Sequence, residues 1–126
     1  MDQPAIDTES YRLRHFVERL IQSDELEIVE QATSLSALAS HWVGNEKAVL
    51  FRDAGPEHSE IVANLMAGRG RLARAFDTTE GELLQTLLGR IATPQKVVEI
   101  DRDDAPVQRV VWTGEDADFL RLPIPL

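Results

Sequence analysis

The sequence predicts a single α/β domain, in which a small sheet of about four to five strands is covered by three to four helices. Two short apolar runs, Ala48–Phe51 and Ile61–Met66, are bounded by turn residues, a pattern typical of strands buried on both faces. Segments before and after these runs have apolar residues at the spacing of amphipathic helices, which can cover such a sheet. The chain has 126 residues, the usual size of one domain. We expect residues 10–126 to form this domain after a flexible N-terminus at residues 1–9.

The composition is that of an acidic globular protein, with a formal net charge of −9 from 22 acidic and 13 basic residues. This charge argues against general binding to nucleic acid, which needs a basic surface to displace counterions, and against adhesion to anionic membranes. The sequence contains no cysteine, which excludes disulfides, thiolate zinc sites and a cysteine nucleophile. No apolar run approaches the roughly 20 residues that span a bilayer. We therefore expect a cytoplasmic protein that binds neither nucleic acid nor membrane.

The first third of the chain predicts a helix, a short strand and a second helix. Thr8 or Ser10 can cap the first helix, whose apolar face is formed by Leu13, Phe16, Val17, Leu20 and Ile21. Glu25–Glu30 alternates polar and apolar residues, as short strands do. Ser34–Val43 has a second helical stripe, and Gly44 can adopt the left-handed conformation that often follows the end of a helix.

The middle of the chain predicts two strands followed by two helices. We expect Arg52–Glu60 to be a turn-rich loop between the two apolar runs. Gly68–Arg71 is expected to form a tight turn that opens the next helix. Thr79–Glu82 fits a capping box and predicts the start of a further helix, which ends at Thr93 because Pro94 follows. The apolar face of this last helix contains Leu83, Leu84, Leu87, Leu88 and Ile91.

The last third predicts two more strands and an apolar end. Val97–Ile100 and Val107–Trp112 are rich in β-branched residues and are separated by the charged turn Asp101–Asp104. A second acidic turn, Thr113–Asp118, precedes an apolar segment at residues 119–126 that contains two prolines. We expect this segment to pack against another surface or to continue into further structure.

The turn Gly68–Arg71 leaves two interpretations open. Backbone amides at a strand-to-helix turn can hold an anion, and Arg69, Arg71 and Arg74 add positive charge. However, the turn lacks both the P-loop pattern and the dinucleotide fingerprint. The favoured interpretation is a tight turn whose arginines are solvated or lie at an interface.

No other motif indicates a reactive centre. The calcium-loop pattern fails at Asp101–Asp104, because glycine is missing at its sixth position and glutamate at its twelfth. The histidines His15, His41 and His58 lack metal-ligand spacing, and no G-x-S-x-G elbow is present. The sequence therefore predicts no catalytic, cofactor-binding or metal-binding residue.

Three ordered segments resemble the N-terminal region of UbiD-type decarboxylases, the carboxy-lyases that depend on prenylated flavin. The resemblance runs from about Tyr11 to Leu126, and its third segment is the most specific. The segments are Leu13–Leu20 with Asp24–Ile28, then Val49–Phe51 with Val62–Leu65 and Gly68–Arg71, and finally Ala105–Val111 with Asp116–Pro125.

The resemblance implies a non-catalytic N-terminal lobe or small subunit, inactive alone, of an oligomeric carboxy-lyase for aromatic or α,β-unsaturated acids. In that family a flavin-reductase-like barrel, which follows this region, holds prenylated FMN, a divalent metal and K⁺ and supplies the catalytic residues. The barrel and the C-terminal domain are absent from this sequence, so they would belong to a larger UbiD-like catalytic subunit or to downstream domains.

The contacts to that partner are expected from two places. One is the arginine group Arg69, Arg71 and Arg74, and the other is the apolar end with Leu122, Pro123, Ile124 and Pro125. Two alternatives come from other classes of protein. One is a stand-alone adaptor or regulatory domain that binds proteins without catalysis, and the weaker one is an anion- or nucleotide-binding module built on Gly68–Arg71.

Overall fold

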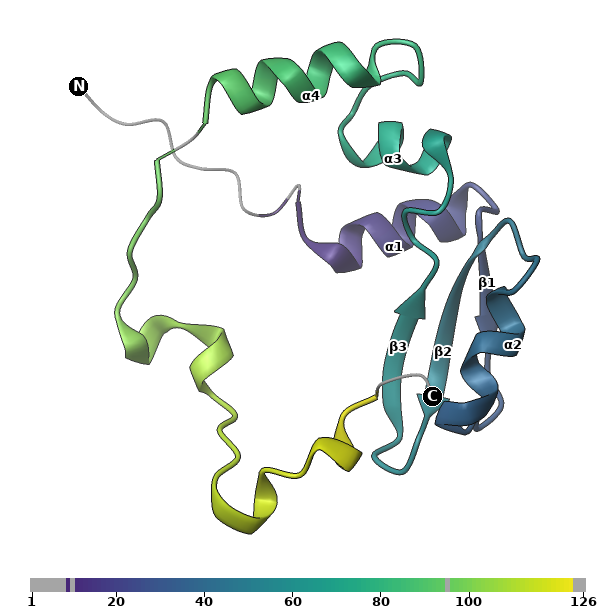
Figure 1. Cartoon of the computed structure of the whole chain (residues 1–126), viewed down its shortest axis with the longest axis vertical. Helices are drawn as coiled ribbons and strands as arrows, with labels where there is room; N and C mark the ends of the chain where they lie inside the picture. The colour runs from purple at the N-terminus through teal and green to yellow at the C-terminus, as the bar shows by residue number, and fades with distance from the viewer. Residues whose placement is uncertain (1–8, 10, 95, 124–126) are drawn as a thin grey trace.

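The computed structural model describes residues 9, 11–94 and 96–123 of the chain. These residues form one three-stranded sheet and four α-helices, so the α/β class is confirmed and the predicted count of four to five strands is wrong. In chain order the elements are α1 (Leu13–Gln22), β1 (Leu26–Val29), α2 (Leu38–Trp42), β2 (Ala48–Ala54), β3 (Ser59–Ala63), α3 (Arg69–Ala75) and α4 (Leu83–Ala92) (Figure 1). None of the described helices is long and apolar enough to cross a membrane.

β2 is the central strand of the sheet. It pairs in parallel with β1, in the register Leu26 to Ala48, and antiparallel with β3, in the register Phe51 to Ile61. The parallel pairing requires a crossover, which the chain makes through a short 3₁₀ turn and α2. The connection between β2 and β3 is instead a tight hairpin, in which Gly55 has a φ of +68°.

The hairpin corrects the expected loop at Arg52–Glu60. β2 continues to Ala54 and β3 begins at Ser59, so most of that stretch is paired strand. The apolar run stops at Phe51 because the next two side chains, the exposed Arg52 and the half-buried Asp53, face away from the core, to which β2 returns at Ala54. A polar strand end of this kind has no hydrophobic pattern that sequence could reveal.

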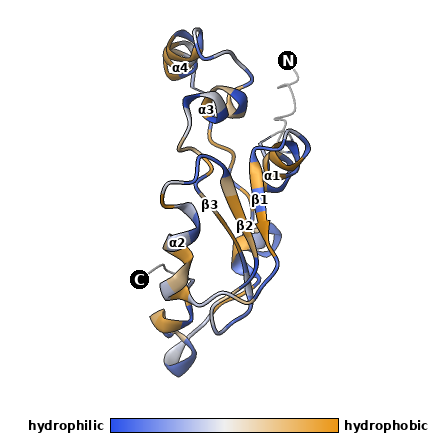
Figure 2. Ribbon diagram, turned by 90° about the vertical axis from the view of Figure 1, so that its right-hand side faces the viewer, coloured by the Kyte–Doolittle hydropathy of each residue, from blue (hydrophilic) through white to orange (hydrophobic). Residues whose placement is uncertain are grey.

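The core has two parts, one on each face of the sheet. Ala48 and Leu50 pack with Phe16 and Leu20 of α1 on one face. Val49, Phe51 and Ala54 pack with Leu38 of α2 on the other. β2 is therefore buried on both faces, as its continuous apolar run predicts. Figure 2 shows α1 and α2 on opposite sides of the hydrophobic strands.

α3 and α4 lie beyond one end of the sheet and not over its faces (Figure 1). α4 begins at Leu83, after a turn in which the hydroxyl of Thr79 accepts from the Glu82 amide at 3.3 Å and donates to the Glu82 carboxylate at 2.9 Å. Of the predicted apolar face only Leu83 is buried. Leu87 is half-buried, and Leu84, Leu88 and Ile91 are exposed, so the described residues cover only part of this face.

The two predicted strands after α4 do not form. Val97–Ile100 has no regular structure, and Val107–Trp112 begins within the 3₁₀ turn Pro106–Gln108 and continues without a strand. β-branched residues favour strands only where a neighbouring strand and a packing surface are available. The described part of the chain offers neither here, because β3 pairs only with β2 and Val97 and Val107 remain almost fully exposed.

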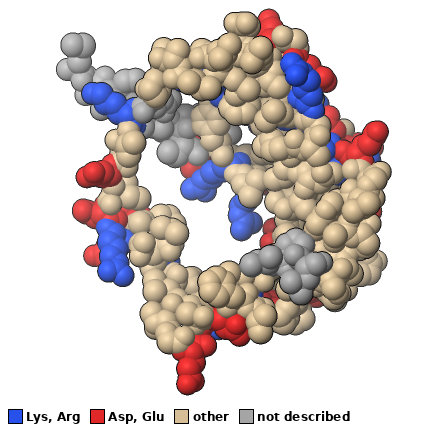
Figure 3. Space-filling model, in the orientation of Figure 1, with Lys and Arg blue, Asp and Glu red and all other residues tan. Residues whose placement is uncertain are grey.

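Residues 96–123 form what we call the C-terminal arm. It contains four short 3₁₀ turns and runs in an arc away from α4 before returning beside the β2–β3 hairpin (Figure 1). The space-filling view shows an opening between the arm and the rest of the chain (Figure 3). The arm is therefore an extension of the α/β body rather than one of its layers.

Candidate functional site

In the segment Gly68–Arg71, Gly68 precedes α3 and the three following residues form the first turn of this helix, where Arg71 is buried. The guanidinium of Arg71 is inside the fold, with the residue 8% exposed. It donates to the backbone carbonyls of Glu46 at 2.6 Å, Asn64 at 3.1 Å and Leu65 at 3.1 Å. These bonds join the loop that enters β2 to the loop that leaves β3.

Asn64 bonds to the same loop that Arg71 contacts before β2. It has a φ of +61°, and its side-chain amide donates to the carbonyls of Asn45 at 3.0 Å and Lys47 at 2.8 Å. Asn64 and Arg71 together satisfy three successive carbonyls, at residues 45, 46 and 47. We call this pair the carbonyl clamp. The sequence placed Asn64 in the segment Val62–Leu65 of the family resemblance but gave it no role, because a bond to residues 17 and 19 positions earlier leaves no local pattern.

The other two arginines also have acceptors within the chain. The guanidinium of Arg69 donates to the carbonyl of Glu80 at 3.1 and 3.3 Å. Arg74 forms an ion pair with the carboxylate of Glu25 at 2.9 Å. The three arginines thus connect α3 to other segments of the chain. The roles proposed for these arginines, in binding an anion or in contacting a partner, stay predictions.

A cleft of about 760 Å³ lies beside the carbonyl clamp. Its charged lining is mainly acidic, from Asp24, Glu25 and Glu46. Of its two cations, Lys47 pairs with Asp24 at 2.7 Å and Arg71 is engaged in the clamp. The carboxylates repel a phosphate group, so this cleft does not fit the phosphate of a flavin nucleotide.

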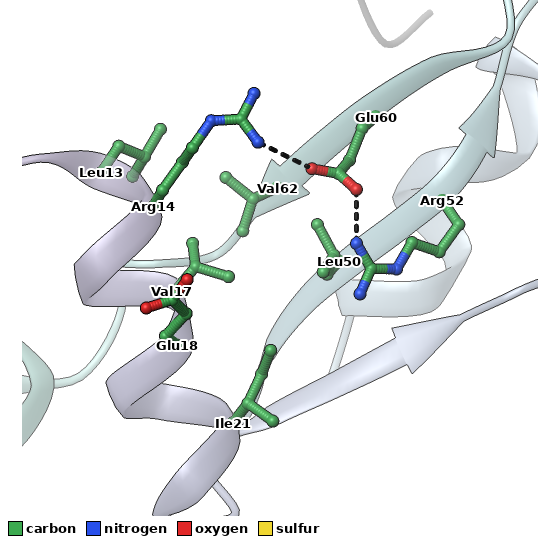
Figure 4. Close-up of a pocket in the computed structure, with 9 residues that line it drawn as sticks. All are labelled: Leu13, Arg14, Val17, Glu18, Ile21, Leu50, Arg52, Glu60 and Val62. Atoms are coloured by element: carbon green, nitrogen blue, oxygen red, sulfur yellow. Dashed lines mark hydrogen bonds and ion pairs between the residues drawn. The ribbon is translucent and has the colours of Figure 1, made fainter.

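A smaller groove separates α1 from the β2–β3 hairpin (Figure 4). It measures about 280 Å³, and Val17, Leu50 and Val62 point into it from the helix and the two strands. Its rim is charged: Glu60 pairs with Arg52 across the hairpin and lies 4.0 Å from Arg14 of α1. The volume is just below the roughly 300–1,000 Å³ of small-molecule sites.

The described residues contain no group of three or more histidine, aspartate or glutamate side chains that could hold a metal ion. His15 bonds the carbonyl of Glu9, His58 bonds Asp53 and His41 packs edge-on against the ring of Phe51. Asp101–Asp104 includes the exposed 3₁₀ turn Arg102–Asp104. Among the described residues, the acidic cleft does not fit the phosphate of prenylated FMN, and no such side-chain group is present for a divalent metal.

Among the described residues, an ion pair links the C-terminal arm to the body. Arg121 donates to both carboxylate oxygens of Glu57 in the hairpin turn, at 3.0 and 3.3 Å. These hydrogen bonds, and then the positive charge of Arg121, lower the pKa of Glu57 below its ordinary value. The same contact raises the pKa of Arg121. The Arg121 guanidinium also lies over the ring of Trp112, 4.6 Å from its centroid.

Of the expected apolar interface, Leu122 and Pro123 lie at the end of the described arm, and Leu122 is 36% exposed. Ile124 and Pro125 lie outside the described residues. The partner of Arg121 could not be read from sequence, since Glu57 is 64 residues away and lies in a segment expected to be an ordinary loop.

Comparison with known proteins identifies the fold. No protein-family pattern matches the sequence, and no curated protein is significantly similar to it. Two solved structures of the UbiD-class enzyme HmfF from Pelotomaculum thermopropionicum are similar, both with a TM-score of 0.76. One is an evolved dimeric form in complex with prFMN, at 24% identity over 92% of this chain. The other is a complex with FMN, at 22% identity over 90% of this chain.

The similarity covers only a part of those enzymes, 28% of the first chain and 26% of the second. At this level of identity it establishes the fold of this chain. The chain is thus similar in structure to about a quarter of a UbiD-class enzyme, in agreement with the resemblance of its sequence to that class.

Proposed function

We propose that this chain is a non-catalytic lobe or small subunit of a UbiD-like carboxy-lyase. The assembly (de)carboxylates aromatic or α,β-unsaturated acids with prenylated FMN, which a partner or downstream region holds together with a divalent metal and K⁺. The observation that carries the proposal is the fold, which matches UbiD-class structures over 92% and 90% of the chain. The assembly is proposed to be oligomeric and cytoplasmic.

The division of labour agrees with the contacts of the described residues. Decarboxylation needs an electron sink, which the modified flavin supplies, and acid–base groups beside it to move the proton. The cleft beside the carbonyl clamp has a mainly acidic charged lining, and Arg69, Arg71 and Arg74 are bonded to acceptors within the chain. The lobe would therefore contribute shape and contact surface to the assembly rather than reacting groups.

Activity measurements with the isolated chain and the assembly test this proposal. The chain alone, supplied with prenylated FMN, metal and K⁺, is expected to release no CO₂ from cinnamate-type or aromatic acids. The assembly isolated from the organism's own cells is expected to release it. Decarboxylation by the chain alone would contradict the non-catalytic role.

The adaptor alternative predicts a different result. Under this alternative, the chain isolates with proteins that contain no flavin. Its preparations then show neither decarboxylation nor carboxylation, as expected of a stand-alone interaction domain. The anion-binding alternative is tested by inorganic phosphate at matched ionic strength, because a ligand of the folded state must raise the melting temperature.

A further inference from the structure

We draw no further inference here: the strongest candidate, the groove between α1 and the β2–β3 hairpin, carries no proposal, because the Glu60 carboxylate on its rim already pairs with Arg14 and Arg52 and nothing among the described residues shows what covers its apolar lining.

Discussion

The Arg71 guanidinium lies 2.6 Å from the backbone carbonyl oxygen of Glu46, a residue 25 positions earlier in the sequence. With its bonds to the carbonyls of Asn64 and Leu65, it holds the two loops at one end of the sheet together. Arg71, which the favoured interpretation of the sequence placed in solvent or at an interface, is thus bonded to backbone oxygens of its own chain.

We predict that Arg71→Ala lowers the free energy of unfolding by about 3 kcal/mol, because buried carbonyls lose a charged donor. Arg69→Ala removes an exposed guanidinium and is expected to cost under about 1 kcal/mol. Urea denaturation of both variants measures the difference. Equal stabilities would contradict the clamp, and Arg71→Lys is expected to recover only part of the loss because lysine has no planar fork of donors.

A matched pair of leucines tests which helices belong to the core. Leu20 of α1 is fully buried, whereas Leu84 of α4 is 58% exposed. Leu20→Ala is expected to destabilise the chain by about 2–5 kcal/mol through lost burial and a cavity. Leu84→Ala is expected to change stability by about 0.5 kcal/mol or less. A large loss for Leu84→Ala in the isolated chain would show that α4 packs on the body.

Two glycines should respond to alanine in opposite directions. Gly55 has a φ of +68°, and a Cβ there would lie 2.8 Å from Cδ2 of Leu35. Gly55→Ala is therefore expected to destabilise by about 1–3 kcal/mol. Gly89 lies inside α4 with nothing within 4 Å of an added Cβ, and Gly89→Ala is expected to stabilise the helix by up to about 1 kcal/mol. Denaturation followed by circular dichroism measures the free energy of unfolding of both variants. An increase in stability for Gly55→Ala would contradict the hairpin geometry.

The attachment of the arm is expected to depend on pH. The pKa of Glu57 is lowered by Arg121, so the paired state binds fewer protons than the free state. The contact is therefore fully formed above the ordinary pKa near 4.5, and it is lost as the pH falls through the lower pKa of the paired carboxyl. The indole resonance of Trp112, which lies under the Arg121 guanidinium, reports the change.

Glu57→Gln provides the control for this titration. Its amide cannot carry the negative charge, so the Trp112 resonance is expected to lie near its low-pH position at neutral pH. A wild-type titration with no step below pH 4.5, or an unchanged step in Glu57→Gln, would show that the pair does not attach the arm.

Sequence alone determined the elements whose signal is local. The continuous apolar run at Ala48–Phe51 predicted a strand buried on both faces, and the periodic face from Leu13 to Ile21 predicted α1. Both predictions hold because burying one helix face leaves a periodic apolar pattern, and burying both faces of a strand leaves a continuous apolar run. The ordered segments that resemble UbiD-type enzymes predicted the likeness to that class, which the similar structures confirm, but not the number of strands.

Tertiary structure decided what depends on residues far apart in the chain. Val97–Ile100 and Val107–Trp112 have strand propensity but no strand to pair with, so they remain in the arm. Arg71 became a bridge between loops only because folding brings the carbonyl of Glu46 beside it. Composition cannot show whether a β-branched run finds a neighbour or an arginine finds an acceptor, because long-range pairing is set by the packing of the whole chain.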